Sequence, residues 1–362
     1  MRVSDAVFYV SQAGVPVCLK GDYGLGKTTI INLFASWLGY RCVRFRLLGA
    51  VPEDFIGYPK VVEKNGRLVT AQIPSEEIIT IFENPLCTVI FDELNRADEA
   101  LQNVIATIVD RGLGQFNLPD SALIFATMNE YGLGTYELNE ALISRFAFFD
   151  CELDLKEEID ALITGVYKTE AKFRRLPENW QEFIPSARLK LSAFIEHRPT
   201  VLAKERLNVQ NSPWPCPRTL HKNAVRGLAA ILSLHREDLE EDVLKACVGA
   251  PFALEYTAFR KNLSLPDPRE VLQQIRSGHN VDYPNPYTLL ISMSDVLVII
   301  ASLSDKEDKL SAVNSVLEFL SKCKFEEVVV PLVKSILQQY PSARVPVRLM
   351  KIKEFLKGLK DD

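Results

Sequence analysis

The chain has 362 residues, of which 47% are hydrophobic and 25% charged. This composition is typical of a folded protein of two or three domains, and it excludes wholesale disorder. The 42 basic and 47 acidic residues give a net charge of −5, which argues mildly against a surface coated with nucleic acid but leaves room for a local basic patch. The 7 cysteines are scattered singly, which excludes a disulfide framework and a CxxC metal site and favours a reducing, cytoplasmic location. We expect no targeting segment and no membrane span.

The first 150 residues alternate short apolar runs with helical patterns, as in an α/β unit with a mostly parallel sheet. Val15–Leu19 predicts a buried strand, and after a glycine-rich turn apolar residues recur at helical spacing until Gly39. Cys42–Leu47 predicts a second strand. Asn65 and Gly66 then separate two strand-like runs, which predicts a hairpin with a two-residue turn.

Further strands are predicted at Cys87–Phe91, Leu123–Ala126 and Phe146–Cys151, so that the expected core is an α/β fold with a mostly parallel five-stranded sheet. Between the first two of these, apolar residues at i, i+3, i+4, i+7 and i+8 predict a helix with one face on the sheet: Leu101, Val104, Ile105, Ile108 and Val109.

From Asp154 onward the pattern is mainly helical, for example in Leu220–Leu234 and Val313–Leu320. Prolines interrupt it around residues 213–217 and again around 283–286. We therefore predict an α/β domain over residues 1–152, a helical lid over residues 153–280 and a helical C-terminal extension over residues 281–362.

Residues 21–28 satisfy the whole pattern GxxxxGK[ST], after a predicted strand and at the start of a predicted helix. Glycines there let backbone N–H groups turn around phosphate oxygens, and the helix dipole favours the anion. Lys27 can reach the β- and γ-phosphates, and Thr28 can bind Mg²⁺. The predicted nucleotide-binding residues of this loop are Gly21, Asp22, Tyr23, Gly24, Leu25, Gly26, Lys27, Thr28 and Thr29.

Asp92 and Glu93 close the third predicted strand. Alone, a strand that ends in Asp-Glu is more often a solvated turn, but beside a phosphate-binding loop the balance reverses, because the carboxyl ends of parallel strands meet at one edge of the sheet. Asp92 can then hold the Mg²⁺ shell with Thr28, and Glu93 can activate the attacking water.

Six segments together resemble the MoxR-type branch of the AAA+ ATPases: GDYGLGKT, PEDFIGYPK, FDELNRA, ATMNE, ISRF and CPRT. The resemblance covers roughly residues 15–225. It implies an AAA+ core that binds ATP and Mg²⁺, hydrolyses ATP to ADP and phosphate, and assembles into a ring with itself, most commonly a hexamer. Nothing in the glycine loop reads the base, so the choice of ATP over GTP rests on the resemblance.

The resemblance also implies roles for residues outside the glycine loop. Asn129 would orient the attacking water as sensor 1; the alternative is an asparagine that only caps its strand. Arg145 would be the arginine finger that reaches the γ-phosphate bound by the neighbouring subunit; the alternative is a surface arginine that pairs with an acidic neighbour. Arg218 would be sensor 2, on the helical lid and in contact with the nucleotide. Arg96 and Arg111 are rival candidates for the finger.

The predicted hairpin at residues 65 and 66 lies where relatives carry an insertion that faces a pore or a partner; the alternative is an ordinary surface hairpin. The sequence departs from the family at residues 111–120, which look short for a second hairpin, and between Arg145 and Arg218, a stretch that is long for a direct run into the lid. After about residue 280 no motif is assigned. The four histidines are isolated, so no metal site beyond Mg²⁺ is expected. Basic residues alternate with apolar ones over residues 344–360 and predict a basic amphipathic helix, either an exposed face or a contact for nucleic acid.

For the biological role, the resemblance implies a chaperone-like remodeller that acts on a protein client with a von Willebrand A domain partner. A nucleic-acid motor of restriction or replication type is the alternative, and the basic C-terminal segment is its local support. A third alternative is a nucleotide switch that assembles without mechanical work. The acidic net charge favours the first of these.

Overall fold

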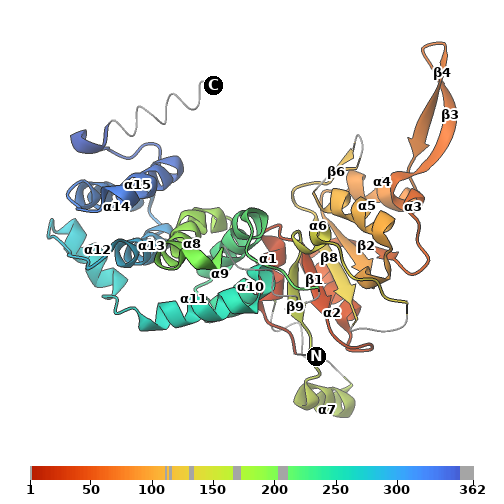
Figure 1. Cartoon of the computed structure of the whole chain (residues 1–362), viewed down its shortest axis with the longest axis horizontal. Coiled ribbons are helices and arrows are strands. Elements are labelled where there is room, and N and C mark those ends of the chain that lie inside the picture. The colour runs from red at the N-terminus through yellow and green to blue at the C-terminus, as the bar shows by residue number, and fades with distance from the viewer. Residues whose placement is uncertain are drawn as a thin grey trace. The chain divides into compact units, whose positions relative to one another are not determined.

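A computed structural model of the chain describes residues 2–110, 112–113, 116–129, 134–165, 173–202 and 211–350 (Figure 1). The chain divides into two compact units. The first comprises Met1–Leu176, Glu205–Gly227 and Asp238–Ala253, and the second comprises Pro177–Lys204, Leu228–Glu237 and Leu254–Asp362. The division into three consecutive domains stays a prediction.

A five-stranded sheet forms the centre of the first unit. Its order is β2-β5-β8-β1-β9, and all its neighbouring strands are parallel, which confirms the α/β core. The strands are β1 (Val17–Lys20), β2 (Arg41–Arg46), β5 (Cys87–Asp92), β8 (Leu123–Met128) and β9 (Ala147–Asp150). Because the strands run in one direction, the residues that follow them gather at a single edge, which we call the carboxyl edge. The opposite side of the sheet is its amino edge.

One face of the sheet is covered by aromatic side chains from helices α1 (Ala6–Gln12) and α2 (Lys27–Leu38). The ring of Phe34 in α2 lies 4.9 Å from that of Phe8 in α1 and 6.3 Å from that of Phe125 in β8, measured between centroids. Helix α2 ends at Gly39, which has a φ of 80° as its C-cap, so glycine is favoured at the predicted stop.

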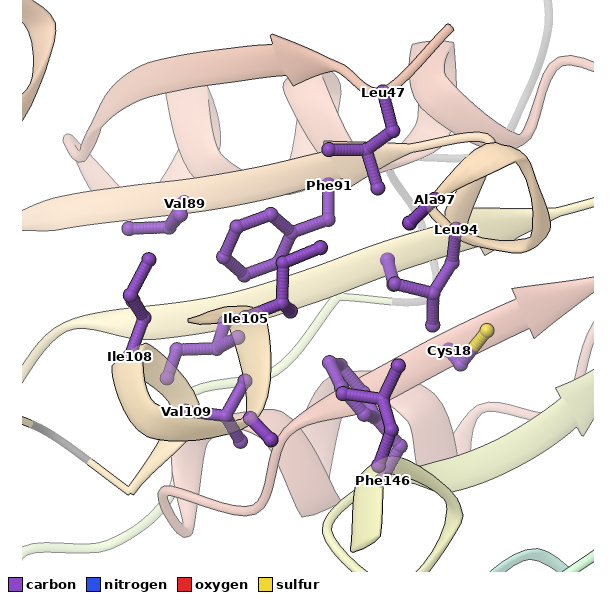
Figure 2. Close-up of a cluster of buried hydrophobic side chains, with 14 of the residues drawn as sticks. Cys18, Leu47, Val89, Phe91, Leu94, Ala97, Ile105, Ile108, Val109 and Phe146 are labelled. Atoms are coloured by element: carbon purple, nitrogen blue, oxygen red, sulfur yellow. The ribbon is translucent and has the colours of Figure 1, made fainter. Parts of the chain in front are cut away.

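The other face packs against helix α5 (Glu99–Val109), as Figure 2 shows for Val89 and Phe91 of the sheet and Ile105 of the helix. Asp98 caps this helix by accepting a hydrogen bond from the N–H of Leu101. Four of the five residues of the predicted stripe are buried, and the fifth, Val104, is half-buried against the same cluster: Leu101, Ile105, Ile108 and Val109 are at most 5% exposed. The predicted orientation of the helix is confirmed.

The predicted hairpin is formed by β3 (Tyr58–Lys64) and β4 (Arg67–Ile73), which pair antiparallel and extend away from the sheet (Figure 1). Asn65 and Gly66 have φ angles of 54° and 72°, as a two-residue turn of type I′ requires. Several apolar side chains of the hairpin are exposed, including Val61 at 63% and Leu68 at 77%.

Shorter elements complete the first unit: α3 (Glu53–Ile56), α4 (Glu76–Glu83), a 3₁₀ turn (Leu94–Arg96), β6 (Gly112–Leu113), β7 (Phe116–Asn117), α6 (Glu140–Ile143), α7 (Leu155–Thr164), a π-helical turn (Thr219–Ala224) and α10 (Glu240–Val248). Strands β6 and β7 pair as a very short antiparallel ladder, in the segment that the sequence predicts to be short.

The second unit is helical. It contains α8 (Ile184–His197), α12 (Pro268–Arg276), α13 (Pro286–Ser302), α14 (Lys306–Leu320) and α15 (Glu326–Gln339), while α9 (Val225–Ser233) and α11 (Ala250–Asn262) each have residues in both units. Its core includes an ion pair between Lys190, which is 1% exposed, and Asp295, with 3.0 Å between Nζ and Oδ1.

Among the described residues, no helix is both long and apolar enough to cross a membrane. Of the predicted basic C-terminal helix, Arg344 and Arg348 are described, and Val347–Leu349 form a 3₁₀ turn. Residues 351–360 of that prediction lie outside the described residues.

Candidate active site

The glycine-rich loop joins β1 to the start of α2 at the carboxyl edge of the sheet. Gly26 is the N-cap of α2 with a φ of 82°, a conformation in which a side chain would be strained. A Cβ atom on Gly26 would meet no other atom within 4 Å, so backbone conformation rather than crowding requires glycine here. The first N–H groups of a helix lack acceptors within it. The start of α2 therefore offers backbone donors to an anion held by this loop.

Lys27, the first residue of α2, is 6% exposed and donates three hydrogen bonds across the loop. Its Nζ lies 2.7 Å from the carbonyl oxygens of Gly21 and Asp22 and 2.8 Å from Oδ1 of Asn129. Burial lowers the pKa of Lys27 from its ordinary value of 10.5. An ammonium group has three N–H donors, so the cation is fully bonded and held at the mouth of the loop.

Asp92 ends β5 beside Thr28, and its carboxylate accepts hydrogen bonds at both oxygens. Oδ1 lies 3.0 Å from Oγ1 of Thr28 and 2.7 Å from Oγ1 of Thr127, and Oδ2 lies 3.1 Å from Nε of Arg44. A second nitrogen of Arg44 also contacts Oδ2. Burial alone would raise the pKa of Asp92, but the hydrogen bonds from Arg44, Thr127 and Thr28 outweigh it and lower the pKa from its ordinary 3.8. Asp92 is therefore held as a carboxylate.

Glu93 follows Asp92 with a φ of 61°, which is unusual for a residue other than glycine. Its N–H donates to Oγ1 of Thr127 at 3.1 Å, and its Oε1 accepts from Nδ2 of Asn129 at 3.3 Å. Asn129 lies immediately after β8, so it joins Glu93 on one side to Lys27 on the other. Strained backbone of this kind is concentrated at functional sites.

The remaining loop residues lie around this cluster. Asp22, Tyr23 and Thr29 are exposed, and Leu25 is half-buried. The hydroxyl of Tyr23 accepts a hydrogen bond from Nη2 of Arg96 at 2.9 Å. The Arg96 guanidinium also lies 3.8 Å from Oε2 of Glu93. This rival candidate for the arginine finger is therefore beside the glycine loop of its own chain.

Arg145 and Arg218 lie elsewhere, and both contact Asp110 at the end of α5. Nε of Arg145 is 3.0 Å from Oδ2 of Asp110, and Nη1 of Arg218 is 3.4 Å from the same oxygen. Arg145 precedes β9, and the register pairs Asp150 of β9 with Lys20 just before the glycine loop. Strand β9 runs from Ala147 to Asp150, about 10 Å at the rise of a strand, and Arg145 lies two residues before its start, at the end of β9 opposite to Asp150. Arg145 therefore lies at the amino edge, far from the glycine loop of its own chain. Arg111, the other rival, lies outside the described residues.

The donors at the carboxyl edge fit a nucleotide with Mg²⁺. Carboxylate and hydroxyl oxygens, as in Asp92 and Thr28, are the hard ligands that Mg²⁺ prefers together with phosphate oxygens. The glycine loop has open space where side chains of Gly24 and Gly26 would project. Within the described part of the chain, no group of three or more His, Cys, Asp or Glu side chains is placed to hold a different metal ion.

Sequence reasoning missed Arg44 and Thr127 at this site. Both lie on sheet strands next to β5, and Arg44 reaches Asp92 from the neighbouring strand β2. A charged residue at an inner position of a predicted strand was the available signal for Arg44. Thr127 is a polar residue within a predicted apolar strand, which is a weaker signal of a functional role.

Residues 16–146 match the family model described as the AAA domain of the dynein-related subfamily. This match runs from just before β1 to the residue that precedes β9, and it includes the glycine loop, Asp92, Glu93 and Asn129. With the parallel sheet and its helices, it defines the class of this segment: residues 16–146 form an AAA domain of the dynein-related subfamily.

Two curated proteins show how far the similarity extends. The chain is 22% identical to midasin of Giardia intestinalis over 210 residues, which cover 55% of this chain and 4% of midasin. It is 28% identical over 149 residues to the aerobic cobaltochelatase subunit CobS of a Sinorhizobium species, covering 36% of this chain and 44% of that subunit. The chain thus spans less than half the length of each of these relatives.

Among solved structures, a putative ATPase from Cytophaga hutchinsonii matches with a TM-score of 0.41 and 16% sequence identity. The match covers 77% of this chain and 89% of the other.

Proposed function

We propose that the protein hydrolyses ATP to ADP and phosphate in a Mg²⁺-dependent reaction. The observation that supports this most directly is the chain of contacts at the carboxyl edge, where Asn129 bonds both Lys27 at 2.8 Å and Glu93 at 3.3 Å. The contacts bring together a cation for phosphate oxygens, a carboxylate for the attacking water and an amide that orients both.

In this proposal Glu93 accepts a proton from the attacking water, whose oxygen bonds to the γ-phosphorus while the bond to the β-phosphate oxygen breaks. Thr28 and Asp92 would hold Mg²⁺, which supplies charge stabilisation to the phosphates. Lys27 uses two of its donors within the loop and the third on Asn129. To bind a phosphate oxygen, its ammonium group must exchange at least one of these bonds, and the carbonyl oxygens of Gly21 and Asp22 are the partners nearest the loop.

We propose that Arg145 completes the site of a neighbouring subunit. Because it lies at the amino edge, at the end of β9 opposite to the residue that pairs with Lys20 beside the glycine loop, it does not reach its own nucleotide. Arg218 shares Asp110 with Arg145, so its predicted contact with nucleotide is also assigned to the neighbour. A ring of subunits, most simply a hexamer, provides such an arrangement, and ATP would favour its assembly.

A first experiment compares the wild-type chain with Lys27→Ala and measures binding of a fluorescent ATP analogue together with phosphate release. We expect Lys27→Ala to lose both, because the phosphates lose their cation, and we expect chelation of Mg²⁺ to stop release by the wild type. Wild-type affinity in Lys27→Ala would show that nucleotide does not bind at this loop. Lys222→Ala, in the π-helical turn of the same unit, is the matched control and should bind normally.

For the biological role, we propose a chaperone-like remodeller of a protein client that acts with a von Willebrand A domain partner. Supporting observations are the β3–β4 hairpin with its exposed Val61 and Leu68 and the acidic net charge of −5. Exposed apolar side chains on a projecting hairpin suit contact with protein.

The role is tested by capture with Glu93→Gln held in ATP, scored for both protein and nucleic acid. A stoichiometric protein that is lost when Val61 and Leu68 are replaced by Ser supports the remodeller. Nucleic acid that survives moderate salt supports the motor alternative instead. Phosphate release that does not change when the captured protein is added back supports a nucleotide switch.

A further inference from the structure

We infer that Asp110 is a positioning residue for hydrolysis, which holds the guanidinium of Arg145 in the orientation that it presents to the nucleotide of the neighbouring subunit. The inference rests on the proposed function of Arg145 as a finger in trans. It adds a residue that neither the sequence motifs nor the contacts around the glycine loop identify.

The contact between the two residues fixes the orientation of the guanidinium. Nε of Arg145 lies 3.0 Å from Oδ2 of Asp110, and Nη2 bonds the same oxygen at 2.5 Å. Nη1 donates to the carbonyl oxygen of Ala141 at 2.5 Å. The arginine side chain is only 14% exposed, so it is held along its length as well as at its end.

Part of the Arg145 guanidinium remains available to bind an anion. A guanidinium has five N–H donors in one plane, and these contacts use three of them. The other two, one on Nη1 and one on Nη2, have no partner among the described residues. They form the fork that suits phosphate oxygens. Asp110 thus holds Arg145 from the Nε side and leaves its outer edge free to bind an anion.

Asp110 follows the last residue of α5, a position at which its carboxylate does not stabilise the helix. Asp110 is the C-cap of α5, where the helix dipole is negative and an acidic side chain is unfavourable. Two arginines surround the carboxylate, since Nη1 of Arg218 lies 3.4 Å from Oδ2. The two cations compensate the charge, and the arrangement joins Asp110 and Arg145, from the segment Met1–Leu176, to Arg218, from the segment Glu205–Gly227 of the first unit.

A positioned guanidinium stabilises developing phosphate charge without reorganising during the reaction, and this is the advantage that fixed donors give a catalyst. Removal of Asp110 should leave the arginine present but free to move. We therefore expect Asp110→Ala to lower kcat at least tenfold, with KM for ATP within about twofold of wild type, and we expect Arg145→Ala to lower kcat by about 10³-fold or more.

Mixed assemblies test the inference. Arg145→Ala mixed with Glu93→Gln should regain activity, because each provides what the other lacks across one interface. Asp110→Ala mixed with Glu93→Gln should also regain activity, whereas Asp110→Ala mixed with Arg145→Ala should not, because both defects lie on the same side. If the first mixture stays inactive, the trans role of Arg145 is wrong. If the first recovers but the third also recovers, Asp110 acts in its own nucleotide site and the inference is overturned.

Two further variants remove a purely structural explanation. Asp110→Asn keeps the shape of the side chain and should assemble normally with reduced kcat; wild-type turnover in this variant would overturn the inference. Asp110→Glu restores the carboxylate and should recover part of the lost kcat. Asp308→Ala removes a comparable exposed ion pair, with 2.9 Å between Asp308 and Arg276 in the second unit, and should leave turnover unchanged.

Discussion

The replacement Asn129→Asp separates the two contacts that this side chain makes, because it changes only the donor half of the amide. The Oδ1 atom that accepts from Lys27 at 2.8 Å is retained. The Nδ2 atom that donates to Glu93 at 3.3 Å becomes a carboxylate oxygen. The variant therefore strengthens the attraction between residue 129 and Lys27 and turns the attraction between residue 129 and Glu93 into a repulsion.

The two electrostatic changes are of similar size. With an effective dielectric constant of about 20, two like charges 3.3 Å apart repel by about 5 kcal/mol, and opposite charges 2.8 Å apart attract by about 6 kcal/mol. The free energy of unfolding should therefore change by only about 1 kcal/mol, and Tm should move by a few degrees.

Activity should change much more than stability. The variant removes the N–H that orients the water and Glu93, so kcat should fall by about 10²-fold or more. The new charge also neutralises Lys27, so KM for ATP should rise by about tenfold, which corresponds to about 1.4 kcal/mol.

The assay is steady-state phosphate release over a range of ATP concentrations, together with thermal unfolding of the same sample. A kcat within twofold of wild type would refute the role assigned to Asn129. A loss of Tm much larger than a few degrees would refute the balance of charges. Asn314→Asp keeps an acceptor for the N–H of Arg344 in the second unit and should leave the kinetics unchanged.

Three other predictions follow from the described contacts. Burial lowers the pKa of Lys27 below 10.5, so its ammonium group loses the proton at a lower pH than an exposed lysine does. Because the neutral amine binds phosphate less well, KM for ATP should rise with pH already below 10.5. A KM that stays constant up to pH 10.5 would contradict this prediction. The lowered pKa of Asp92 contributes stability above its ordinary pKa of 3.8 that is lost as the pH falls through the lower folded value. Arg44→Met should therefore cost about 1–3 kcal/mol at neutral pH and move acid unfolding to higher pH, as measured by urea titration between pH 3 and 7; an unchanged acid midpoint would count against the pair. Phe91 is fully buried in the cluster of Figure 2, so Phe91→Ala should lower the free energy of unfolding by about 3–5 kcal/mol, and a loss below 1 kcal/mol in chemical denaturation would contradict that packing.

Several features of the first unit could be predicted because each depends on residues close together in the sequence. The turn at Asn65 and Gly66, the helix stop at Gly39 and the apolar stripe of α5 each depend on neighbouring residues, and the structure confirms all three. The contacts of Lys27 with Asn129 and of Thr28 with Asp92 were also anticipated as residues at one edge, because parallel strands bring their carboxyl ends together.

The contacts that the sequence did not predict depend on which strands are neighbours. Arg44 reaches Asp92 only because β2 pairs with β5 in a particular register, and no local pattern encodes that pairing. Asp110 joins Arg145 and Arg218 from three distant segments. A motif search finds the arginines but not the carboxylate between them, and it does not indicate that Arg218 lies with Arg145 and away from the glycine loop.

In the proposed reaction, Glu93 at the carboxyl edge activates water for hydrolysis of bound ATP. The most direct measurement follows bound nucleotide and released phosphate in the same sample for the wild type and Glu93→Gln, with Glu99→Gln, an exposed residue in the first turn of α5, as control. We expect Glu93→Gln to bind ATP as tightly as the wild type and to release phosphate at least 10²-fold more slowly, while Glu99→Gln behaves as wild type. Phosphate release by Glu93→Gln at the wild-type rate would contradict the role of Glu93 in hydrolysis.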